Sequence, residues 1–220
     1  MMFLFDTSAM RTTKKKEDDL SKIVPVKNNN EGFFLQQPQN TKTQQKPPTP
    51  KKSQDELKYE KRRKDIADYE KAIQSNPQNA VLKKKLSDLY VEEANFWVPE
   101  FAERYAIPAL EKAIKYAPER AKELKSKIAD KYIQFANFWS PEFTESYAIP
   151  ALKKALKSSP ERKTEISGLI ANKYIQYANF WVPEFSKQYK IPALKNAAKY
   201  ASTPEQKKKI EQMLDKLGAK

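Results

Sequence analysis

Two residue types are missing from this 220-residue chain, which contains neither histidine nor cysteine. Without imidazole or thiolate groups, the chain lacks the usual side chains for general-base catalysis near neutral pH, zinc coordination and disulfide bonds. Its only three glycines, Gly32, Gly168 and Gly218, stand isolated, which excludes the glycine-rich loops that bind phosphate groups. We therefore expect no enzyme activity, no catalytic or metal-binding residues, no cofactor and no small-molecule substrate.

Long apolar runs are also missing. The first apolar run, Met1–Phe5, is followed by Asp6 and by Lys14–Lys16, so it is too short and wrongly flanked for a secretory signal. No stretch approaches the roughly 20 apolar residues that a transmembrane helix needs. We expect a soluble, cytoplasmic protein without a membrane span.

Basic residues are in excess, with 42 Lys+Arg against 28 Asp+Glu and a formal net charge of +14. Such an excess favours a partner with an acidic protein surface or a nucleic acid. Only six of the basic residues are arginine, the residue suited to bidentate phosphate or base recognition, and acidic residues interleave with the lysines. An acidic protein partner is the favoured prediction, and a nucleic-acid-associated accessory protein, for example in a ribonucleoprotein, is the alternative.

Residues 1–54 differ in composition from the rest of the chain. They contain runs of Asn, Gln and Pro, few apolar groups and no helical or strand periodicity, which predicts a disordered or extended basic tail. Two apolar islands interrupt it, Met1–Phe5 and the triplet Phe33, Phe34 and Leu35. These islands are either incidental or short anchors that become ordered against a protein partner.

The remainder of the chain is repetitive, with one block recurring three times at a period of 42 residues. The block reads Asn-Phe-Trp-x-Pro-Glu-Phe and occupies residues 95–101, 137–143 and 179–185. A downstream match, Tyr-x-Ile-Pro-Ala-Leu, recurs at 105–110, 147–152 and 189–194. Repetition at this length is typical of solenoids, in which each unit buries its apolar face against the next.

Each repeat is predicted to contain two helices, so the fold class is all-α. In the second repeat, apolar residues from Leu124 to Trp139 recur at spacings of three or four. Ser140 and Pro141 then resemble an N-cap and a first helical residue, which predicts the start of a second helix. That helix contains Pro150, which is expected to kink it, as are the equivalent Pro108 and Pro192.

Two aromatic columns accompany the repeated block. One contains Phe96, Phe138 and Phe180, and the other contains Trp97, Trp139 and Trp181. Aromatic residues at helical spacing usually fill a core, and we assign the phenylalanines and the three prolines to the structure of the repeat. The alternative is that one aromatic side chain of each repeat, and we name the tryptophans as candidates, stays exposed to bind a protein.

The segment Tyr69–Tyr90 resembles the junction between two tetratricopeptide repeats, with Ala72, Pro77 and Leu86 at matching positions. The likeness covers about three quarters of the chain, although the period of 42 exceeds the family's usual length of about 34 residues. It implies an α-solenoid of stacked antiparallel helix pairs within residues 55–220. The expected parts are a half-repeat at 57–77, repeats at about 78–118, 119–160 and 161–203, and a capping helix at 204–217.

The family also implies a function, that of a non-catalytic protein-binding scaffold. We expect a structural or bridging subunit of a larger assembly that binds through its repeat surfaces and its N-terminal tail. Some members grip a peptide carboxylate with Lys and Asn at set positions of the first helix. The matching positions here hold Asp88, Asp130 and Asn172, which makes them candidate protein-binding residues, although only Asn172 suits carboxylate binding.

Overall fold

The computed structural model describes residues 53–219, and the predictions that fall on residues 1–52, including Phe33–Leu35, lie outside the described range. The first helix, α1 (Gln54–Ser75), begins with a capping box. The Glu56 N–H donates to Ser53 Oγ at 3.2 Å, and the Ser53 N–H donates to Glu56 Oε2 at 2.6 Å. No strand occurs between residues 53 and 219, which confirms the all-α prediction for this part of the chain.

Three helix pairs and a final helix follow α1. The first helices of the pairs are α2 (Ala80–Phe96), α4 (Ala121–Phe138) and α6 (Lys163–Phe180). The second helices contain the regular segments α3 (Ile107–Tyr116), α5 (Ile149–Ser158) and α7 (Ile191–Tyr200). The final helix is α8 (Pro204–Lys216). Short 3₁₀ turns precede α4 and α6, namely η5 (Pro118–Arg120) and η8 (Pro160–Arg162).

Each second helix begins irregularly, with a 3₁₀ turn followed by a π-helical turn. The 3₁₀ turns are η3 (Pro99–Phe101), η6 (Pro141–Phe143) and η9 (Pro183–Phe185). The π turns are η4 (Ala102–Ala106), η7 (Thr144–Ala148) and η10 (Ser186–Lys190). In each second helix the backbone hydrogen bonds therefore change from the 3₁₀ to the π pattern and then from the π to the α pattern.

The π turns correct the prediction of a proline kink inside a regular α-helix. The Ile149 N–H donates to Thr144 O, five residues back, and Pro150 is the second residue of α5. Proline has no N–H to donate. It therefore fits where the backbone hydrogen bonds change from the five-residue spacing of the π turn to the four-residue spacing of the α-helix. Pro108 and Pro192 occupy the same place in α3 and α7.

Ser140 and Pro141 stand where predicted, at the N-cap and at the first position of η6, but the Ser140 side chain does not cap the turn. Its hydroxyl makes no capping hydrogen bond, and Val98 and Val182, which have no hydroxyl, occupy the same place in the other repeats. The turn is instead closed by the backbone, since the Phe143 N–H donates to the Ser140 carbonyl at 3.0 Å. Proline at the first position fixes the backbone for helix initiation without any side-chain cap.

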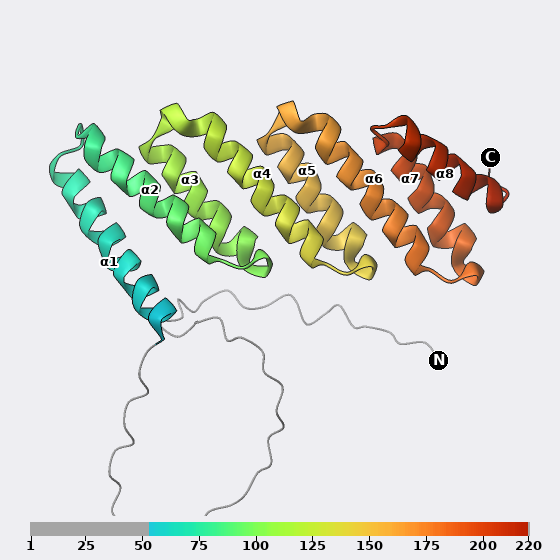
Figure 1. Ribbon diagram of the computed structural model, residues 1–220, viewed down its shortest axis with the longest axis horizontal. Helices are drawn as coiled ribbons and strands as arrows, with labels where there is room; N and C mark the ends of the chain where they lie inside the picture. The colour runs from blue at the N-terminus through green and yellow to red at the C-terminus, as the bar shows by residue number, and fades with distance from the viewer. Residues whose placement is uncertain (1–52, 220) are drawn as a thin grey trace, which may run out of the picture. The chain divides into compact units, whose positions relative to one another are not determined.

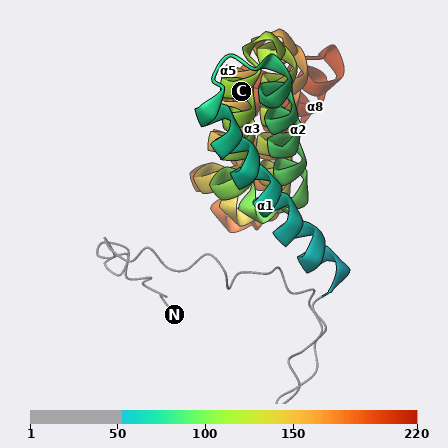
Figure 2. The same ribbon diagram turned by 90° about the vertical axis from the view of Figure 1, so that its left-hand side faces the viewer.

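The helix pairs stack in chain order within residues 58–220, which form one compact unit. Each first helix packs against the second helix of its own repeat, and α4 and α6 also pack against the second helix of the repeat before, in the contacts α3·α4 and α5·α6. The turns that join the two helices of a repeat follow one edge of the stack, and those that join successive repeats follow the other (Figure 1). Figure 2 shows the stack from the end that carries α1.

The core repeats with the sequence. Leu110, Leu152 and Leu194 are at most 1% exposed, and small buried alanines accompany them at the same repeat positions, which lets the helices approach closely. These alanines are Ala94, Ala136 and Ala178 in the first helices and Ala113, Ala155 and Ala197 in the second. Among the helices of residues 53–219, none combines the length and the apolarity of a membrane span.

Candidate interaction surfaces

Each junction between the first and second helix of a repeat holds the same aromatic cluster. A tryptophan stacks on a tyrosine, with centroid distances of 4.1 Å for Trp97–Tyr105, 4.2 Å for Trp139–Tyr147 and 4.0 Å for Trp181–Tyr189. Two phenylalanines meet each tryptophan edge-on, namely Phe96 and Phe101, Phe138 and Phe143, and Phe180 and Phe185. The cluster explains why the block is repeated, because each aromatic residue that recurs in it contacts the tryptophan of its own repeat.

Much of this aromatic surface is open to solvent. Of the nine large apolar side chains that are exposed between residues 53 and 219, seven belong to the junctions. We call these seven the aromatic edge: Val98, Phe138, Phe143, Tyr147, Phe180, Val182 and Phe185. A row of exposed apolar groups on one edge of a fold is typical of a protein-interaction surface.

The tryptophans and phenylalanines differ in how much of each side chain is exposed to solvent. Trp97 is only 7% exposed, and Trp139 and Trp181 are half-buried within their clusters. Phe138 and Phe180, predicted to fill the junction, are instead 48% and 46% exposed, whereas Phe96, which ends α2 in the same way, is only partly exposed. The more accessible aromatic groups in repeats two and three are therefore phenylalanines, which the sequence had not singled out for binding.

The first repeat differs because α1 covers its cluster. The ring of Tyr59 stacks on Phe96 at a centroid distance of 4.8 Å and meets Trp97 edge-on at 5.9 Å. The Arg62 guanidinium lies 5.3 Å from the Phe96 ring centroid, in cation–π geometry. Within the described residues, Phe138 and Phe180 have no ring contact other than the neighbouring tryptophan.

The residue one helical turn before each tryptophan differs between the repeats. These residues are Glu93, Phe135 and Tyr177, all of them buried. The indole N–H groups of Trp139 and Trp181 are both buried without a hydrogen-bond partner among the described residues. Burial raises the pKa of Tyr177, so its hydroxyl stays protonated at neutral pH.

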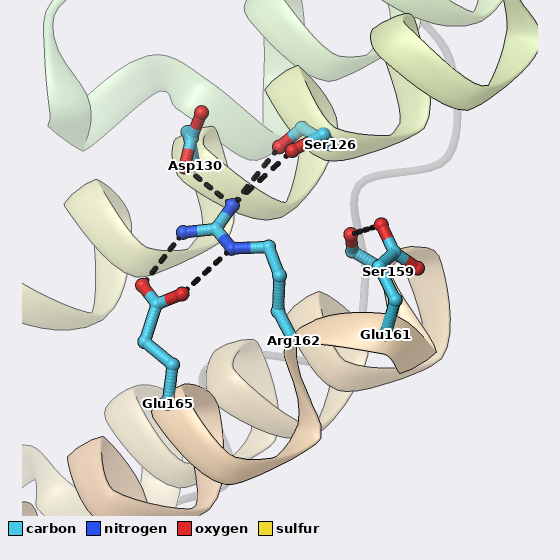
Figure 3. A network of polar contacts seen from close by, with 6 residues as sticks. All are labelled: Ser126, Asp130, Ser159, Glu161, Arg162 and Glu165. Atoms are coloured by element: carbon cyan, nitrogen blue, oxygen red, sulfur yellow. Dashed lines mark hydrogen bonds and ion pairs between the residues drawn. The ribbon is translucent and has the colours of Figure 1, made fainter.

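The candidate residue Asp130 takes part in a polar network between repeats (Figure 3). Arg162 Nη1, from the turn before α6, lies 2.6 Å from Asp130 Oδ1 and also reaches the Ser126 carbonyl at 3.4 Å. The same guanidinium donates two hydrogen bonds to Glu165, at 2.7 and 2.9 Å. Beside it, the Ser159 hydroxyl donates to Glu161.

The same arrangement joins the neighbouring repeats. Arg120 Nη1 lies 2.5 Å from Asp88 Oδ1, and Arg120 also donates to Glu123. At the last junction a neutral residue takes this place, because Gln206 Nε2 donates to Asn172 Oδ1 at 2.9 Å and to the Gly168 carbonyl at 3.0 Å.

The three candidate residues Asp88, Asp130 and Asn172 thus have partners within the chain, which gives them a role in joining repeats. Their role in binding another protein stays a prediction. Arg120, Arg162 and Gln206 were missed as partners. A signal was present for the arginines, since Pro-Glu-Arg occurs at residues 118–120 and again at 160–162, one period later.

Lysine is distributed unevenly over the second helices. Residues 99–116 carry three basic and three acidic side chains, residues 141–158 carry three and two, and residues 183–200 carry four and one. The positive charge of the second helices therefore increases toward the third repeat. On the first helices, burial lowers the pKa of Lys131 and of Lys173, which lie in equivalent positions.

Among residues 53–219, no group of three or more acidic side chains is arranged to hold a metal ion. Comparison of the chain with protein-family models, with curated proteins and with solved structures gives no match. The helical repeat arrangement therefore rests on the chain's own periodicity and on its structure.

Proposed function

We propose that the chain is a non-catalytic protein-binding scaffold of the tetratricopeptide-like kind, acting as a structural or bridging subunit of a larger assembly. The observation that carries the proposal is the aromatic edge, whose seven exposed apolar groups all lie at the junctions that recur with the period of the fold. Leaving this many apolar groups in water is unfavourable, at about 25 cal/mol for each Å² exposed. A partner protein that covered the edge would recover this free energy.

The rigidity of the repeat region supports the same function. Rigid clusters bind with a smaller loss of side-chain entropy than flexible ones, and stacked tryptophan and tyrosine rings hold the exposed phenylalanines in place. Phenylalanine at the end of a helix is also a compact anchor that fits an apolar pocket in a partner.

The N-terminal segment is proposed as a second binding element. Phe33, Phe34 and Leu35 lie outside the described residues, and their role as anchors stays a prediction. Deletion of residues 1–52 from the tagged chain would reveal which partners depend on that segment.

The alternative function is association with nucleic acid through the lysine-rich surface. The rise in positive charge toward the third repeat favours it. Binding through phosphates weakens steeply as salt concentration rises, whereas binding through an apolar edge is much less sensitive.

The experiment compares partners captured by the tagged full-length chain, by an F138S/F180S variant and by a V81S variant. Val81 is a matched control, since it is 64% exposed and lies at the start of α2, on the opposite edge. We expect F138S/F180S to reduce capture of at least one protein about tenfold, and V81S to leave it unchanged. The proteins should stay bound after nuclease treatment and in about 0.5 M salt.

Two results would contradict the proposal. Equal capture by the unsubstituted chain and F138S/F180S would exclude the aromatic edge as the binding surface. Loss of every partner after nuclease treatment would favour the nucleic-acid alternative instead.

A further inference from the structure

The last helix, α8, is shorter than the helices whose place it takes. It contains 13 residues, whereas α4 and α6 contain 18 each. At about 1.5 Å per residue, the difference amounts to roughly 7 Å of helix. The helix ends at Lys216, and Gly218 follows with a φ of 63°, a left-handed conformation that favours glycine and stops the helix.

Because α8 is short, it covers only part of the third repeat. In the inner junctions, α4 packs against η3 and η4 as well as α3, and α6 packs against η6 and η7 as well as α5. In contrast, α8 packs against α6 and α7 and, among the described elements, contacts neither η9 nor η10. Figure 1 shows α8 beside one end of α7 only, away from the edge that holds the aromatic junctions.

The side chains confirm that this part of the third repeat is open. In the first repeat, Ala106 is fully buried and Ile107 is 3% exposed, and Ala148 and Ile149 in the second repeat match them. The equivalent residues of the third repeat, Lys190 and Ile191, are both partly exposed. We call the open surface formed by Ser186, Lys187, Lys190 and Ile191 the end face.

The end face also departs from the repeat in its charge. Lys187 stands where the first two repeats have Glu103 and Glu145, and Lys190 stands where they have alanine. At the first inner junction, Glu103 accepts a hydrogen bond from Lys154 of the following second helix at 2.8 Å. Because Lys154 belongs to α5, this pair shows only that the Glu103 position faces a side chain of opposite charge in the next repeat. With lysine at positions 187 and 190 the end face is positive, so the group that complements it is a carboxylate. Within the described residues, neither Lys187 nor Lys190 has an ion-pair partner.

We propose that the end face binds an α-helix of a partner protein that carries an apolar stripe flanked by Asp or Glu. The partner helix continues the stack, resting on η10 as α4 rests on η4 and α6 on η7. This inference rests on the proposed protein-binding role, but it uses a surface and variants separate from Phe138 and Phe180.

The shape of the site explains why a helix is the occupant. Both inner junctions are filled by a helix packed against a π turn, with the buried Ala106 or Ala148 beneath it. At the end face Lys190 takes the place of this alanine, so a helix there rests on Ile191 and on the aliphatic part of the Lys190 side chain. The end face keeps the π turn and the isoleucine of that junction, but among residues 53–219 no helix takes the place that α4 and α6 take at the inner junctions. The two lysines then select for acidic partner helices over basic ones.

The probe is a fluorescent peptide with the sequence of residues 128–143, which includes the part of the second repeat, from residue 131 onward, whose equivalent is missing from α8. A hydrocarbon link between positions 130 and 134 keeps this short peptide helical. In the acidic peptide, K131E, N137E and F138E supply carboxylates, and in the basic peptide lysine stands at the same three positions. Fluorescence anisotropy with the full chain measures the two affinities.

The key variant of the chain is K187E/K190A, which places at both positions the residues that the first two repeats carry. It therefore suits the fold, and circular dichroism and thermal melting should match the unsubstituted chain. The matched control is K195E/K199E, which removes two exposed lysines from α7 outside the end face.

We expect the acidic peptide to bind the unsubstituted chain with a dissociation constant of about 10–100 μM, which corresponds to roughly −6 kcal/mol. K187E/K190A should weaken this binding at least tenfold, K195E/K199E less than threefold, and the basic peptide should not bind. The F138S/F180S variant should bind the acidic peptide normally, so failure of the aromatic edge and failure of the end face give different results.

Three results would overturn the proposal. They are failure of the acidic peptide to bind the unsubstituted chain, unchanged binding by K187E/K190A, and equal weakening by the control variant. The last result would show that general positive charge attracts the peptide.

Discussion

The first and third repeats carry the same block at the same period, yet neighbouring helices cover them differently. In the first repeat, Tyr59 covers Phe96, and Ala106 is fully buried in the junction with the next repeat. In the third repeat, Phe180 is 46% exposed, and Lys190 is partly exposed. The same repeated residues are therefore buried in one repeat and exposed in another, according to whether a neighbouring helix packs against them.

The largest predicted effect tests whether the two repeats share the same core. Leu110→Ala and Leu194→Ala should each lower the free energy of unfolding by about 2–5 kcal/mol, because both leucines are at most 1% exposed. Chemical denaturation followed by circular dichroism measures the loss. A much smaller loss for Leu194 than for Leu110 would show that the third repeat contributes less to the cooperative core.

The next effect separates the covered from the uncovered aromatic cluster. Phe96→Ala should cost about 2 kcal/mol of stability, whereas Phe180→Ala should cost less than about 1 kcal/mol, because half of the Phe180 side chain already contacts water. Tyr59→Ala, combined with Phe96→Ala in a double-mutant cycle, should give a coupling of about 0.5–1.5 kcal/mol. Equal losses for the two phenylalanines would contradict the proposed role of α1.

The smallest effect concerns the polar links between repeats. Arg162→Ala should cost about 1 kcal/mol, because the guanidinium links Asp130, Ser126 and Glu165 but is partly exposed. High salt should reduce the stability that Arg162 contributes and leave the neutral Gln206–Asn172 link unchanged. The comparison of Arg162→Ala with Gln206→Ala at two salt concentrations measures this difference.

Lowering the pH should weaken the same polar links between repeats. The hydrogen bond from Arg162 lowers the pKa of Glu165, and that from Arg120 lowers the pKa of Glu123. A carboxylate with a lowered pKa stabilises the fold above the pKa of the unfolded chain, and this stability is lost as pH falls through the folded-state value. An E123Q/E165Q variant should therefore lose less stability than the unsubstituted chain below about pH 4. Equal acid sensitivity of the two proteins would show that these carboxylates do not contribute.

Much of the fold could be predicted because a period of 42 residues and an apolar spacing of three or four leave little choice but stacked helices. Ser140 and Pro150 show the limit of that approach. Ser140 is the N-cap residue, as predicted, but the hydrogen bond that closes the turn comes from the backbone and not from its hydroxyl. Proline inside a predicted helix indicates a kink, and only the structure reveals the π turn that accommodates it.

The candidate sites were harder to predict. The aromatic block was evident in the sequence, but the exposure of Phe138 and Phe180 was not, because identical sequence positions are covered in one repeat and open in another. Asp88 and Asp130 were named for their place in the first helix, while their arginine partners come from the following repeat, 32 residues away. Contacts of this kind depend on how the repeats stack.

The sequence by itself determined the helical repeat, its length, the chemical types absent from it and the positions of its aromatic residues. These properties are local, because helix formation and periodic burial depend on residues within a few turns of one another. Only the tertiary structure decided which aromatics are exposed, which charges are paired and which parts of each repeat a neighbouring helix covers. Those properties depend on whether a neighbouring helix is present, and the sequence of a single repeat contains no information about its neighbour.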